Sequence, residues 1–519
     1  MSGFHQWSGI MKIKRVSIKN FRGYSETVSV DFADLRVLVG KNDIGKSTFL
    51  EALDIFFNEG KACKKIDKGD VNKKSLLEGD NSIEISVEFD SLPSAILIDS
   101  SNETTLESEY LLTESGSLRI VKKYPNAGKE KVFISAMHPT NPQCKDLLLK
   151  KISDLRKILD ALELDCVDKT KSAELRKSIW SGIDDLQLQE YQIEVAKIDH
   201  KSIWEQLKSY MPLYTLFQSD RENNDGDSEV QDPMRLAVKE ILSDEQIQRD
   251  LADVASTVKG RLDKVASRTL EKLKEMNPDI ANSLAPKLPD PVNLKWIDVF
   301  KNVSIAGDED IPINKRGSGV KRLILINFFR AEAERRQEEA NLPNVIYAIE
   351  EPETSQHPEH QRSLIDALVE LSRTTNAQVL LTTHSPEIVK RLRFENILLV
   401  SGRKQEELIQ VSRNELPYPS LNEVNYLAFD ELSHEYHNEL YGFIDAEGAM
   451  ESYKQGKDEI KYNKLLNNRS TSEKSIVLSE YIRHQIHHPE NKTNQPFTQD
   501  QLKKSIDEMR CFIQDNLRV

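Results

Sequence analysis

Residues 40–47 have the composition and the spacing of a phosphate-binding loop. They read G-K-N-D-I-G-K-S, which fits the pattern G-x-x-x-x-G-K-[ST]. Glycines let backbone N–H groups turn inward around phosphate oxygens, and the helix that follows adds a partial positive charge at its N-terminus. In this pattern Lys46 reaches the β- and γ-phosphates of ATP, and the Ser47 hydroxyl ligates Mg²⁺. The other predicted nucleotide-binding residues of the segment are Gly40, Asn42, Asp43, Ile44, Gly45 and Thr48.

Two adjacent glutamates are the acids that such a loop requires. Residues 345–349 are an apolar run that reads as a buried strand, and Glu350 and Glu351 follow it directly. Glu350 can hold the Mg²⁺ shell, whereas Glu351 can orient and deprotonate the attacking water. We therefore expect ATP hydrolysis, with Glu350 as a metal ligand and Glu351 and Lys46 as catalytic residues.

Three shorter segments fit the same chemistry. His384 ends another apolar strand, 33 residues after Glu351, and from there it can contact the γ-phosphate and sense hydrolysis. Ser318 and Gly319 lie in R-G-S-G-V-K, just before a predicted helix, where small residues expose backbone N–H groups to phosphate. The segment I-K-N-F-R-G, which contains Arg22, follows the first predicted strand. His384 is thus a third catalytic candidate.

These residues need an α/β framework to bring them together. Apolar patterns predict strands near residues 13–18, 28–30, 35–39, 83–89, 118–123 and 132–134, and a helix over 49–56. Residues 144–280 are mostly helical in pattern. One apolar stripe there would pack on a partner helix, and it consists of Leu148, Ile152, Leu155, Leu159, Leu162 and Cys166. A proline-rich connector at 285–298 leads to a second α/β block, and helix formers dominate after residue 400.

Length and composition set outer limits. A chain of 519 residues allows about two to four domains. A net charge of −14 argues against a wholly basic nucleic-acid coat, although the lysine-rich segment 61–74 remains a candidate for phosphate-backbone contact. The four separate cysteines predict neither a zinc ribbon nor a disulfide framework. No apolar run could span a bilayer and no signal core is visible, so we expect a cytoplasmic protein without membrane contact.

The order of the motifs is specific. N-F-R-G, the phosphate loop, G-S-G, E-E-P-E and T-T-H-S-P resemble, in that order, the ABC-type ATPase head of SMC-like and OLD-like proteins. The resemblance implies that Arg22 contacts nucleotide and that Ser318 and Gly319 act in trans, so that two heads form a dimer around two ATP molecules. The segment 316–321 departs from the usual L-S-G-G-Q, and Glu350 replaces the common aspartate. With both departures ATP binding is still expected, whereas the rate of ATP hydrolysis is left open.

Four domains follow from this resemblance. Residues 11–140 would be the N-terminal lobe of the head with the phosphate loop, and 141–290 a helical insertion. Residues 291–405 would be the C-terminal lobe with the signature, the acidic strand end and the histidine loop. Residues 406–519 would form a helical C-terminal domain that docks a partner.

The C-terminal region sets the chain apart from OLD-like nucleases, which carry a Toprim nuclease domain after the head. Ser401 stands where a Toprim domain needs glutamate, and no D-x-D follows. Instead, N-Y-L-A-F, H-E-Y-H-N-E-L-Y and I-R-H-Q-I-H-H-P-E-N resemble segments of the ATPase subunit of Septu anti-phage systems (PtuA-like), including those encoded beside retrons. That resemblance implies a separate HNH nuclease subunit (PtuB-like) and, in the retron case, a reverse transcriptase with its DNA–RNA product.

One C-terminal segment has a competing interpretation. Arg483 and His488 fit R-[NDH]-x-x-x-H, the pattern of HEPN ribonucleases, in which both residues flank an RNA phosphate. His484 and His488 are also spaced to bind a metal on one helix face. The simplest alternative is a helix end whose cationic side chains favour the local dipole before Pro489.

The sequence as a whole predicts an ABC-type ATPase that binds ATP and Mg²⁺ between two subunits and controls a partner nuclease in anti-phage defence. Two other functions stay open. The chain could itself cut RNA through Arg483 and His488, or it could be an SMC-like DNA-repair ATPase.

Overall fold

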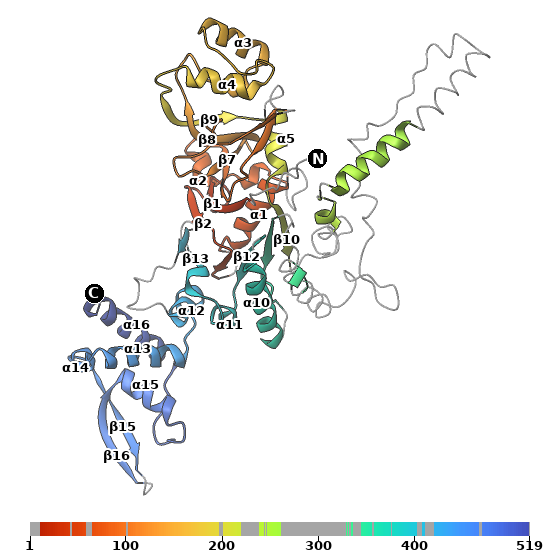
Figure 1. Cartoon of the computed structure of the whole chain (residues 1–519). Coiled ribbons are helices and arrows are strands. Elements are labelled where there is room, and N and C mark those ends of the chain that lie inside the picture. The colour runs from red at the N-terminus through yellow and green to blue at the C-terminus, as the bar shows by residue number, and fades with distance from the viewer. Residues whose placement is uncertain are drawn as a thin grey trace.

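The computed structural model describes most of the N-terminal and C-terminal thirds of the chain (Figure 1). The described residues are 11–41, 44–58, 65–99, 102–196, 201–218, 238–242, 244, 246–260, 329, 331, 334–335, 344–354, 358–374, 376–401, 407–410, 420–466 and 470–517. Asn42 and Asp43 lie outside them, as do the predicted signature residues Ser318 and Gly319 and the connector 285–298.

An antiparallel sheet forms one layer of the head. Its hydrogen-bonded order is β2-β1-β4-β7-β8-β9. The strands are β1 (Lys12–Lys19), β2 (Val28–Asp31), β4 (Ser82–Asp90), β7 (Leu118–Pro125), β8 (Lys131–Pro139) and β9 (Leu188–Glu194). Every other residue points inward, as Val16 and Ile18 do in β1, because successive side chains of a strand alternate between its two faces. All the predicted N-terminal strands are present.

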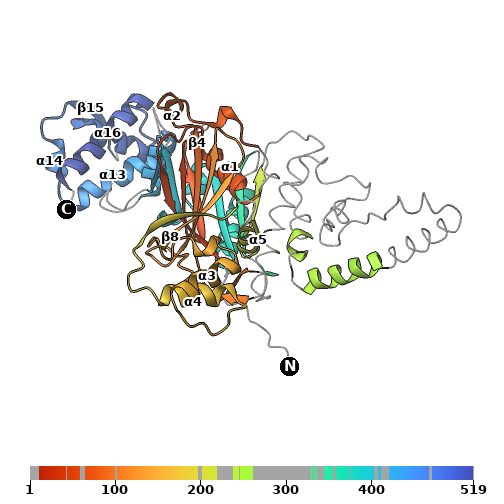
Figure 2. The ribbon, with the colours of Figure 1, turned by 90° about the horizontal axis from the view of Figure 1, so that it is seen from above.

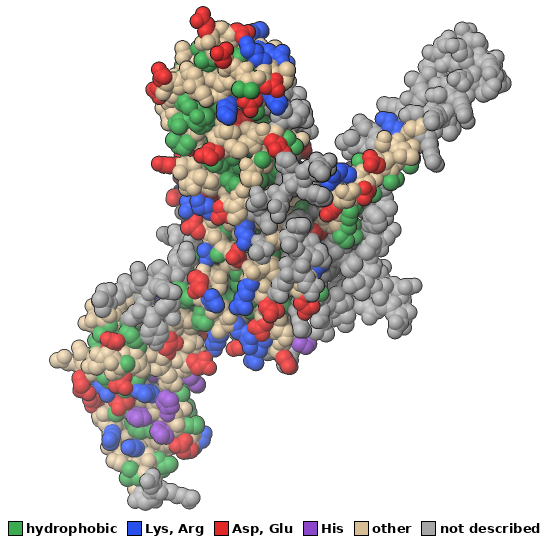
Figure 3. Space-filling view, viewed as in Figure 1, with side chains coloured by type: hydrophobic (Ala, Val, Ile, Leu, Met, Phe, Trp, Pro, Cys, Tyr) green, Lys and Arg blue, Asp and Glu red, His purple; other side chains and the backbone are tan. Residues whose placement is uncertain are grey.

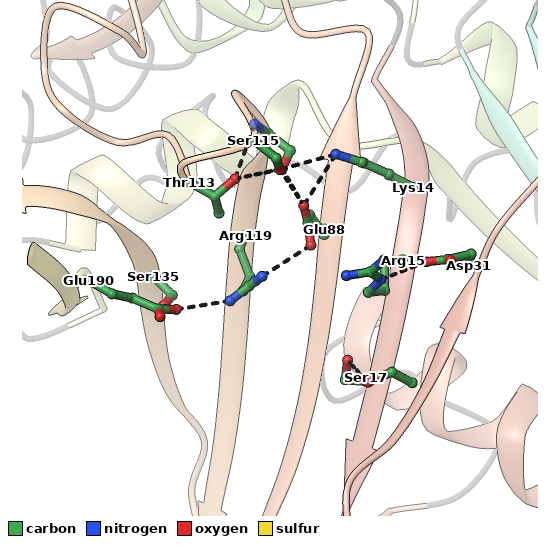
Figure 4. Close-up of polar contacts among 12 residues, drawn as sticks. Lys14, Arg15, Ser17, Asp31, Glu88, Thr113, Ser115, Arg119, Ser135 and Glu190 are labelled. Carbon is green, nitrogen blue, oxygen red and sulfur yellow. Dashed lines mark hydrogen bonds and ion pairs between the residues drawn. The ribbon is translucent and has the colours of Figure 1, made fainter.

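The outer face of this sheet carries a polar network centred on Glu88 (Figure 4). One Glu88 oxygen lies 3.3 Å from Arg119 and the other 3.6 Å from Lys14. Arg119 also contacts Glu190 of β9 at 2.9 Å. Burial raises the pKa of Glu88, but hydrogen bonds from Ser117 and the nearby Arg119 outweigh it and hold that pKa below its usual value. Cross-strand polar pairs therefore stabilise this face of the sheet.

A second, mostly parallel sheet lies across from the first. Its order is β10-β11-β12-β3-β13-β14, and only β14 is antiparallel to its neighbour. The strands are β10 (Leu213–Gln218), β11 (Val345–Glu350), β12 (Ala377–Thr383), β3 (Leu35–Val39), β13 (Ile397–Ser401) and β14 (Glu407–Gln410). β3, β11 and β12 are continuous buried runs, as expected for strands covered on both faces.

Helices fill the space between and beside the sheets (Figure 2). Helix α1 (Lys46–Phe57) packs between the two sheets, and its Phe49 and Leu53 share one core with Val87 and Ile346. Helices α10 (Pro358–Ser372) and α11 (Pro386–Val389) cover the opposite face of the parallel sheet. The observed architecture is the predicted α/β head.

A small helical unit lies between β8 and β9 in the sequence. Helices α3 (Ile152–Ala161) and α4 (Ser172–Ser181) pack on each other through Leu155, Leu159 and Ile179, so the predicted partner helix is present. The predicted stripe was too long for one helix, because Leu148 lies in a separate 3-10 turn and packs in the head core, while Leu162 and Cys166 follow the end of α3. A two-stranded sheet of β5 (Ile96–Asp99) and β6 (Asn102–Thr104) and helix α5 (Lys201–Ser209) complete this part. However, β9 and β10 also fall within the stretch 141–290 and pair with strands of the head. The stretch is therefore not helical throughout.

The C-terminal region projects from the opposite end of the head (Figure 1). Its helices are α12 (Leu421–Phe429), α13 (His434–Ala446), α14 (Met450–Lys454), α15 (Leu478–His487) and α16 (Gln499–Asn516). It also contains an antiparallel hairpin that the helical prediction missed, formed by β15 (Glu459–Leu465) and β16 (Thr471–Val477). Helix α12 joins both parts, because Val424 and Ala428 lie in the head core while Tyr426 lies in the C-terminal core.

In the described part of the chain, every helix is too short or too polar to cross a membrane.

Candidate nucleotide-binding site

The predicted catalytic residues converge on one edge of the parallel sheet. The carboxyl ends of β3, β12 and β11 are adjacent there, since Thr383 pairs with Val39 and Leu381 pairs with Ile349. Gly40 follows β3, Glu350 ends β11, and His384 follows β12. In open α/β sheets this edge is where ligands bind. Segments more than 300 residues apart in the chain are thereby brought to one place.

The start of the phosphate loop has no room for a side chain. A Cβ added to Gly40 would lie 2.8 Å from the Val400 carbonyl oxygen and 3.1 Å from the Ile44 side chain. Gly45 precedes α1 with φ 93°, in the left-handed region that favours glycine. The Tyr24 hydroxyl donates a hydrogen bond of 3.1 Å to the Gly45 carbonyl. Both glycines of the motif therefore have a backbone reason to be glycine.

Lys46 is held within the loop. Its ammonium donates to the carbonyl oxygens of Gly40 at 2.8 Å and Lys41 at 2.7 Å, and the residue is only 3% exposed. The same ammonium lies 3.5 Å from Glu351 Oε1. Lys46 thus presents its charge at the sheet edge, at the N-terminus of α1, where backbone N–H groups also favour anions. Ser47 is half-buried in the first turn of that helix, and Thr48 is buried beside it.

Glu351 links Lys46 to His384. Its Oε2 lies 3.2 Å from His384 Nδ1, while its Oε1 faces Lys46. Glu351 adopts φ 40°, an uncommon conformation for a residue with a side chain, and its N–H donates to the Thr382 hydroxyl at 3.1 Å. Strained backbone of this kind persists where the surroundings hold it. Glu351, His384 and Lys46 therefore form one contiguous group, and their catalytic roles stay a prediction.

Glu353 is the functional residue that the sequence reasoning left without a role. Its side chain is 3% exposed, and Oε1 accepts hydrogen bonds from the Thr383 hydroxyl at 2.6 Å and the His384 N–H at 2.8 Å. Burial raises the pKa of the Glu353 carboxyl, despite these hydrogen bonds. Glu353 thus ties the acidic segment to the histidine loop. Glu353 lies in E-E-P-E and its partners lie in T-T-H-S-P, so both motifs were visible in the sequence. Their spacing along the chain does not show that they are in contact.

The strand register brings the end of one further strand, β10, to the same edge of the sheet. Gln218 ends β10 opposite Glu350, the last residue of β11. The sequence offered no glutamine for this site, because only the pairing of β10 with β11 brings the end of β10 to this edge. Glu350 is half-buried there, at the strand end expected for a metal ligand.

Arg22 has other partners. Its guanidinium contacts Glu51 of α1 and lies 2.8 Å from Asp70. Arg22 also has φ 49°, so its backbone is held in the left-handed region. Glu51 thus fastens the N-F-R-G turn to the helix that follows the phosphate loop, and Asp70 fastens it to the 3-10 turn Lys68–Asp70. The predicted nucleotide contact of Arg22 stays a prediction.

The C-terminal region touches the same loops. Lys41 of the phosphate loop contacts Asp430, which follows α12. The Asn425 amide of α12 donates to the Pro386 carbonyl at 3.3 Å, just after the histidine loop, and Lys390 pairs with Glu435 of α13 at 2.9 Å. The nucleotide site and the C-terminal domain therefore share contacts.

Arg483 and His488 face different neighbours. The Arg483 guanidinium lies 4.2 Å above the Tyr441 ring of α13. His488 lies beside His484, which stacks on Tyr462 of β15 with ring centroids 5.0 Å apart. Arg483 belongs to the α13 side of helix α15, and the histidine pair to the hairpin side.

The residues present fit ATP with Mg²⁺. The loop has glycines where close backbone approach is needed, a buried lysine, and a helix N-terminus that carries no acidic side chain in its first turn. Ser47 and Glu350 offer a hydroxyl and a carboxylate, the hard oxygen donors that Mg²⁺ prefers. Mg²⁺ is usually bound by one or two such groups together with substrate phosphates and water.

Comparisons with known proteins identify an ATPase domain. A family model described as "AAA ATPase domain" matches residues 11–389. Endonuclease GajA of Bacillus cereus (strain VD045) is 24% identical over 404 residues, which are 77% of this chain and 59% of that protein. An OLD nuclease of Thermus scotoductus (strain ATCC 700910 / SA-01) is 24% identical over 416 residues, 76% of this chain and 63% of that protein. The chain thus spans about three-fifths of the length of these relatives.

Solved SMC heads are more distant. The SMC head domain from Thermotoga maritima aligns with a TM-score of 0.30 and 11% identity, over 77% of this chain and 99% of that one. The Smc head domain from Pyrococcus furiosus, bound to the C-terminal domain of ScpA, aligns with a TM-score of 0.33 and 14% identity, over 80% and 98%.

Proposed function

This chain belongs to the AAA ATPase domain family, and we propose that it hydrolyses ATP at the carboxyl edge of its parallel sheet and uses the nucleotide state to control a partner nuclease in anti-phage defence. One observation carries the catalytic part. Glu351 lies between Lys46 at 3.5 Å and His384 at 3.2 Å, so a cation and a histidine from two other segments meet on one carboxylate, the proposed base.

Each residue then has a defined task. Lys46 and the N–H groups at the start of α1 bind and orient the phosphates, since both are positive and both are fixed by the fold. Glu351 accepts the proton of the attacking water through the oxygen that faces His384, while its other oxygen faces Lys46. His384 positions the water and the γ-phosphate. Bound Mg²⁺ would neutralise charge that develops on the phosphate oxygens.

Two variants with matched controls test the catalytic part. We expect Glu351→Gln to bind ATP normally but to lower turnover by about 10²- to 10⁴-fold, the usual contribution of a general base. Lys46→Ala should lose ATP binding itself. Glu114→Gln and Lys177→Ala, which change exposed residues of the same types, should behave like the wild-type chain. Unchanged turnover in Glu351→Gln would refute the role of this residue.

The partner part of the proposal has separate support. The two curated relatives are named as nucleases, yet in this chain Ser401 ends the strand where a Toprim domain would carry glutamate. The C-terminal motifs resemble those of Septu ATPase subunits, whose nuclease is a separate HNH subunit (PtuB-like). We propose that this subunit docks on the C-terminal domain, with a reverse transcriptase and its DNA–RNA product as further partners in a retron setting.

Head-to-head dimerisation belongs to the same proposal. Ser318 and Gly319 would complete the site of the second subunit, and ATP would hold the two heads together. Co-expression with a PtuB-like HNH protein, followed by size-exclusion chromatography with light scattering, tests both associations. We expect ATP to favour the dimer in Glu351→Gln, where it is bound but not hydrolysed. A monomer at every ATP concentration, or no complex with the HNH protein, would contradict this part.

A further inference from the structure

We infer that one face of the C-terminal domain, formed by α13, α15 and β15, binds the backbone of a single-stranded nucleic acid. This inference goes beyond the proposed ATPase function and does not depend on it. Five of the 11 histidines of the chain lie in this domain. Figure 3 shows histidine side chains gathered on its visible face, with lysine and arginine side chains next to them.

Arg483 is the centre of this face. Its guanidinium stacks 4.2 Å from the centroid of the Tyr441 ring, and no carboxylate within salt-bridge distance is found for it among the described residues. A guanidinium that stacks by its flat face keeps its in-plane N–H groups at the edge, where they can bind a phosphate in a bidentate manner. Tyr441 holds the side chain in one orientation, so less conformational entropy is lost when an anion binds.

Exposed imidazole rings lie along the same helix. His487 and His488 are exposed at the end of α15, and the His484 side chain is 38% exposed. His484 rests on the buried Tyr462 ring, with ring centroids 5.0 Å apart. The His488 ring lies 6.2 Å from the His484 ring, centroid to centroid. Rings presented in this way can stack with bases, but only with bases that are not already paired and stacked in a duplex. They therefore favour a single strand.

Charges of both signs lie on the three elements of this face. The buried His437 lies behind it and bonds Ser505 of α16 at 3.0 Å. Burial, together with the neighbouring His434 and Arg483, lowers the pKa of His437 to about 4, so His437 stays neutral and supplies no charge. Among the carboxylates, Glu480 pairs with Lys454 at 3.0 Å, Glu490 with His488 at 3.2 Å and Glu435 with Lys390 at 2.9 Å, whereas the exposed Asp445 lies one helical turn from Tyr441. Lys464 of β15 adds a further positive charge beside His484.

The inference is tested by fluorescence anisotropy with the full chain, without nucleotide, and with labelled 20-nucleotide RNA and DNA strands and their duplexes. We expect the wild-type chain to bind the single strands more tightly than the duplexes. Arg483→Ala should weaken binding about 10-fold and reduce the slope of log Kd against log salt by about 1, as expected for one lost phosphate contact. Arg483→Lys, which keeps the charge but loses the planar fork, should fall in between.

Arg156→Ala is the matched control, because Arg156 is an exposed arginine on α3, at the far end of the molecule (Figure 1). It should bind like the wild-type chain. Equal affinity of Arg483→Ala and wild type, or a preference for duplex, would overturn the inference. So would binding of a labelled polyglutamate peptide but of neither strand, which would make this face a protein docking surface. Cleavage of the RNA strand, lost in Arg483→Ala, would replace binding by ribonuclease activity. Thermal unfolding of each variant checks its fold.

Discussion

Replacing Glu353 tests whether the acidic segment positions the histidine loop. In Glu353→Ala the Thr383 hydroxyl and the His384 N–H both lose their acceptor, which lies at 2.6 and 2.8 Å. Hydrogen bonds to a charged group contribute about 1.5–3 kcal/mol each. Part of that loss is recovered, because the variant no longer buries a carboxylate whose pKa is raised by burial and whose Oε2 has no hydrogen-bond partner among the described residues.

The net loss of positioning is therefore about 1–3 kcal/mol, which corresponds to roughly a 10- to 100-fold lower kcat. The Kd for ATP should stay within about 3-fold of wild type, because binding relies on Lys46 and the start of α1, whereas Glu353 bonds Thr383 and His384. Steady-state turnover and equilibrium nucleotide binding, measured on the same preparation, separate the two effects.

Two companion variants sharpen the result. Glu353→Gln keeps an acceptor oxygen at the same place, so its kcat should stay within about 3-fold of wild type. Thr383→Val removes one of the two donors and should lie between wild type and Glu353→Ala. If Glu353→Ala turns over ATP at the wild-type rate, or if Gln and Ala lower kcat equally, the positioning argument is refuted.

Three further predictions concern other parts of the molecule. Arg176→Met should destabilise the α3–α4 unit by about 3–5 kcal/mol, because it leaves the Glu109 carboxylate buried without the two 2.7 Å hydrogen bonds from Arg176. The double variant with Glu109→Leu should regain part of this stability, as measured by thermal unfolding. Gly40→Ala should weaken ATP binding at least about 10-fold in a calorimetric titration, because its Cβ would lie 2.8 Å from a backbone oxygen, whereas Gly442→Ala, with open space around it, should be neutral or slightly stabilising. His437 has a pKa of about 4 in the folded chain and about 6.5 in the unfolded chain. Its contribution to stability is therefore present above pH 6.5 and is lost as the pH falls through 4, a change on the order of 3 kcal/mol. His437→Phe should show a shallower fall in melting temperature between about pH 7 and 5.

The strands and helices whose pattern lies within one continuous segment could be predicted from the sequence. The run before the phosphate loop became β3, the helix after it became α1, and residues 345–349 became β11, because continuous apolar runs and helical spacing are visible within one element. The convergence of Lys46, Glu351 and His384 was also predictable, since motifs at the ends of parallel strands share an edge. The predicted domain boundaries themselves remain a prediction.

The features that depend on tertiary register were not predictable. β10 reads as a short apolar run within a helical stretch, and only its pairing with β11 places Gln218 at the site. The hairpin β15–β16 is mostly exposed, so it lacks the strong apolar alternation by which strands are recognised. Arg22 was assigned by its motif, but its contacts with Glu51 and Asp70 follow from how the N-F-R-G turn meets α1 and the 3-10 turn Lys68–Asp70.

The pairing of β13 with β3 has a practical consequence for dissecting the molecule. The family match ends at residue 389, before β13 begins, yet Leu398 and Leu399 pair with Leu38 and Val39 in the centre of the sheet. A fragment cut at 389 would turn β3, the strand that carries the phosphate loop, into an open edge prone to aggregation. It would also lose the core contacts of Val424. The smallest fragment expected to fold must therefore run through α12, so the ATPase head and the first C-terminal helix form one cooperative folding unit.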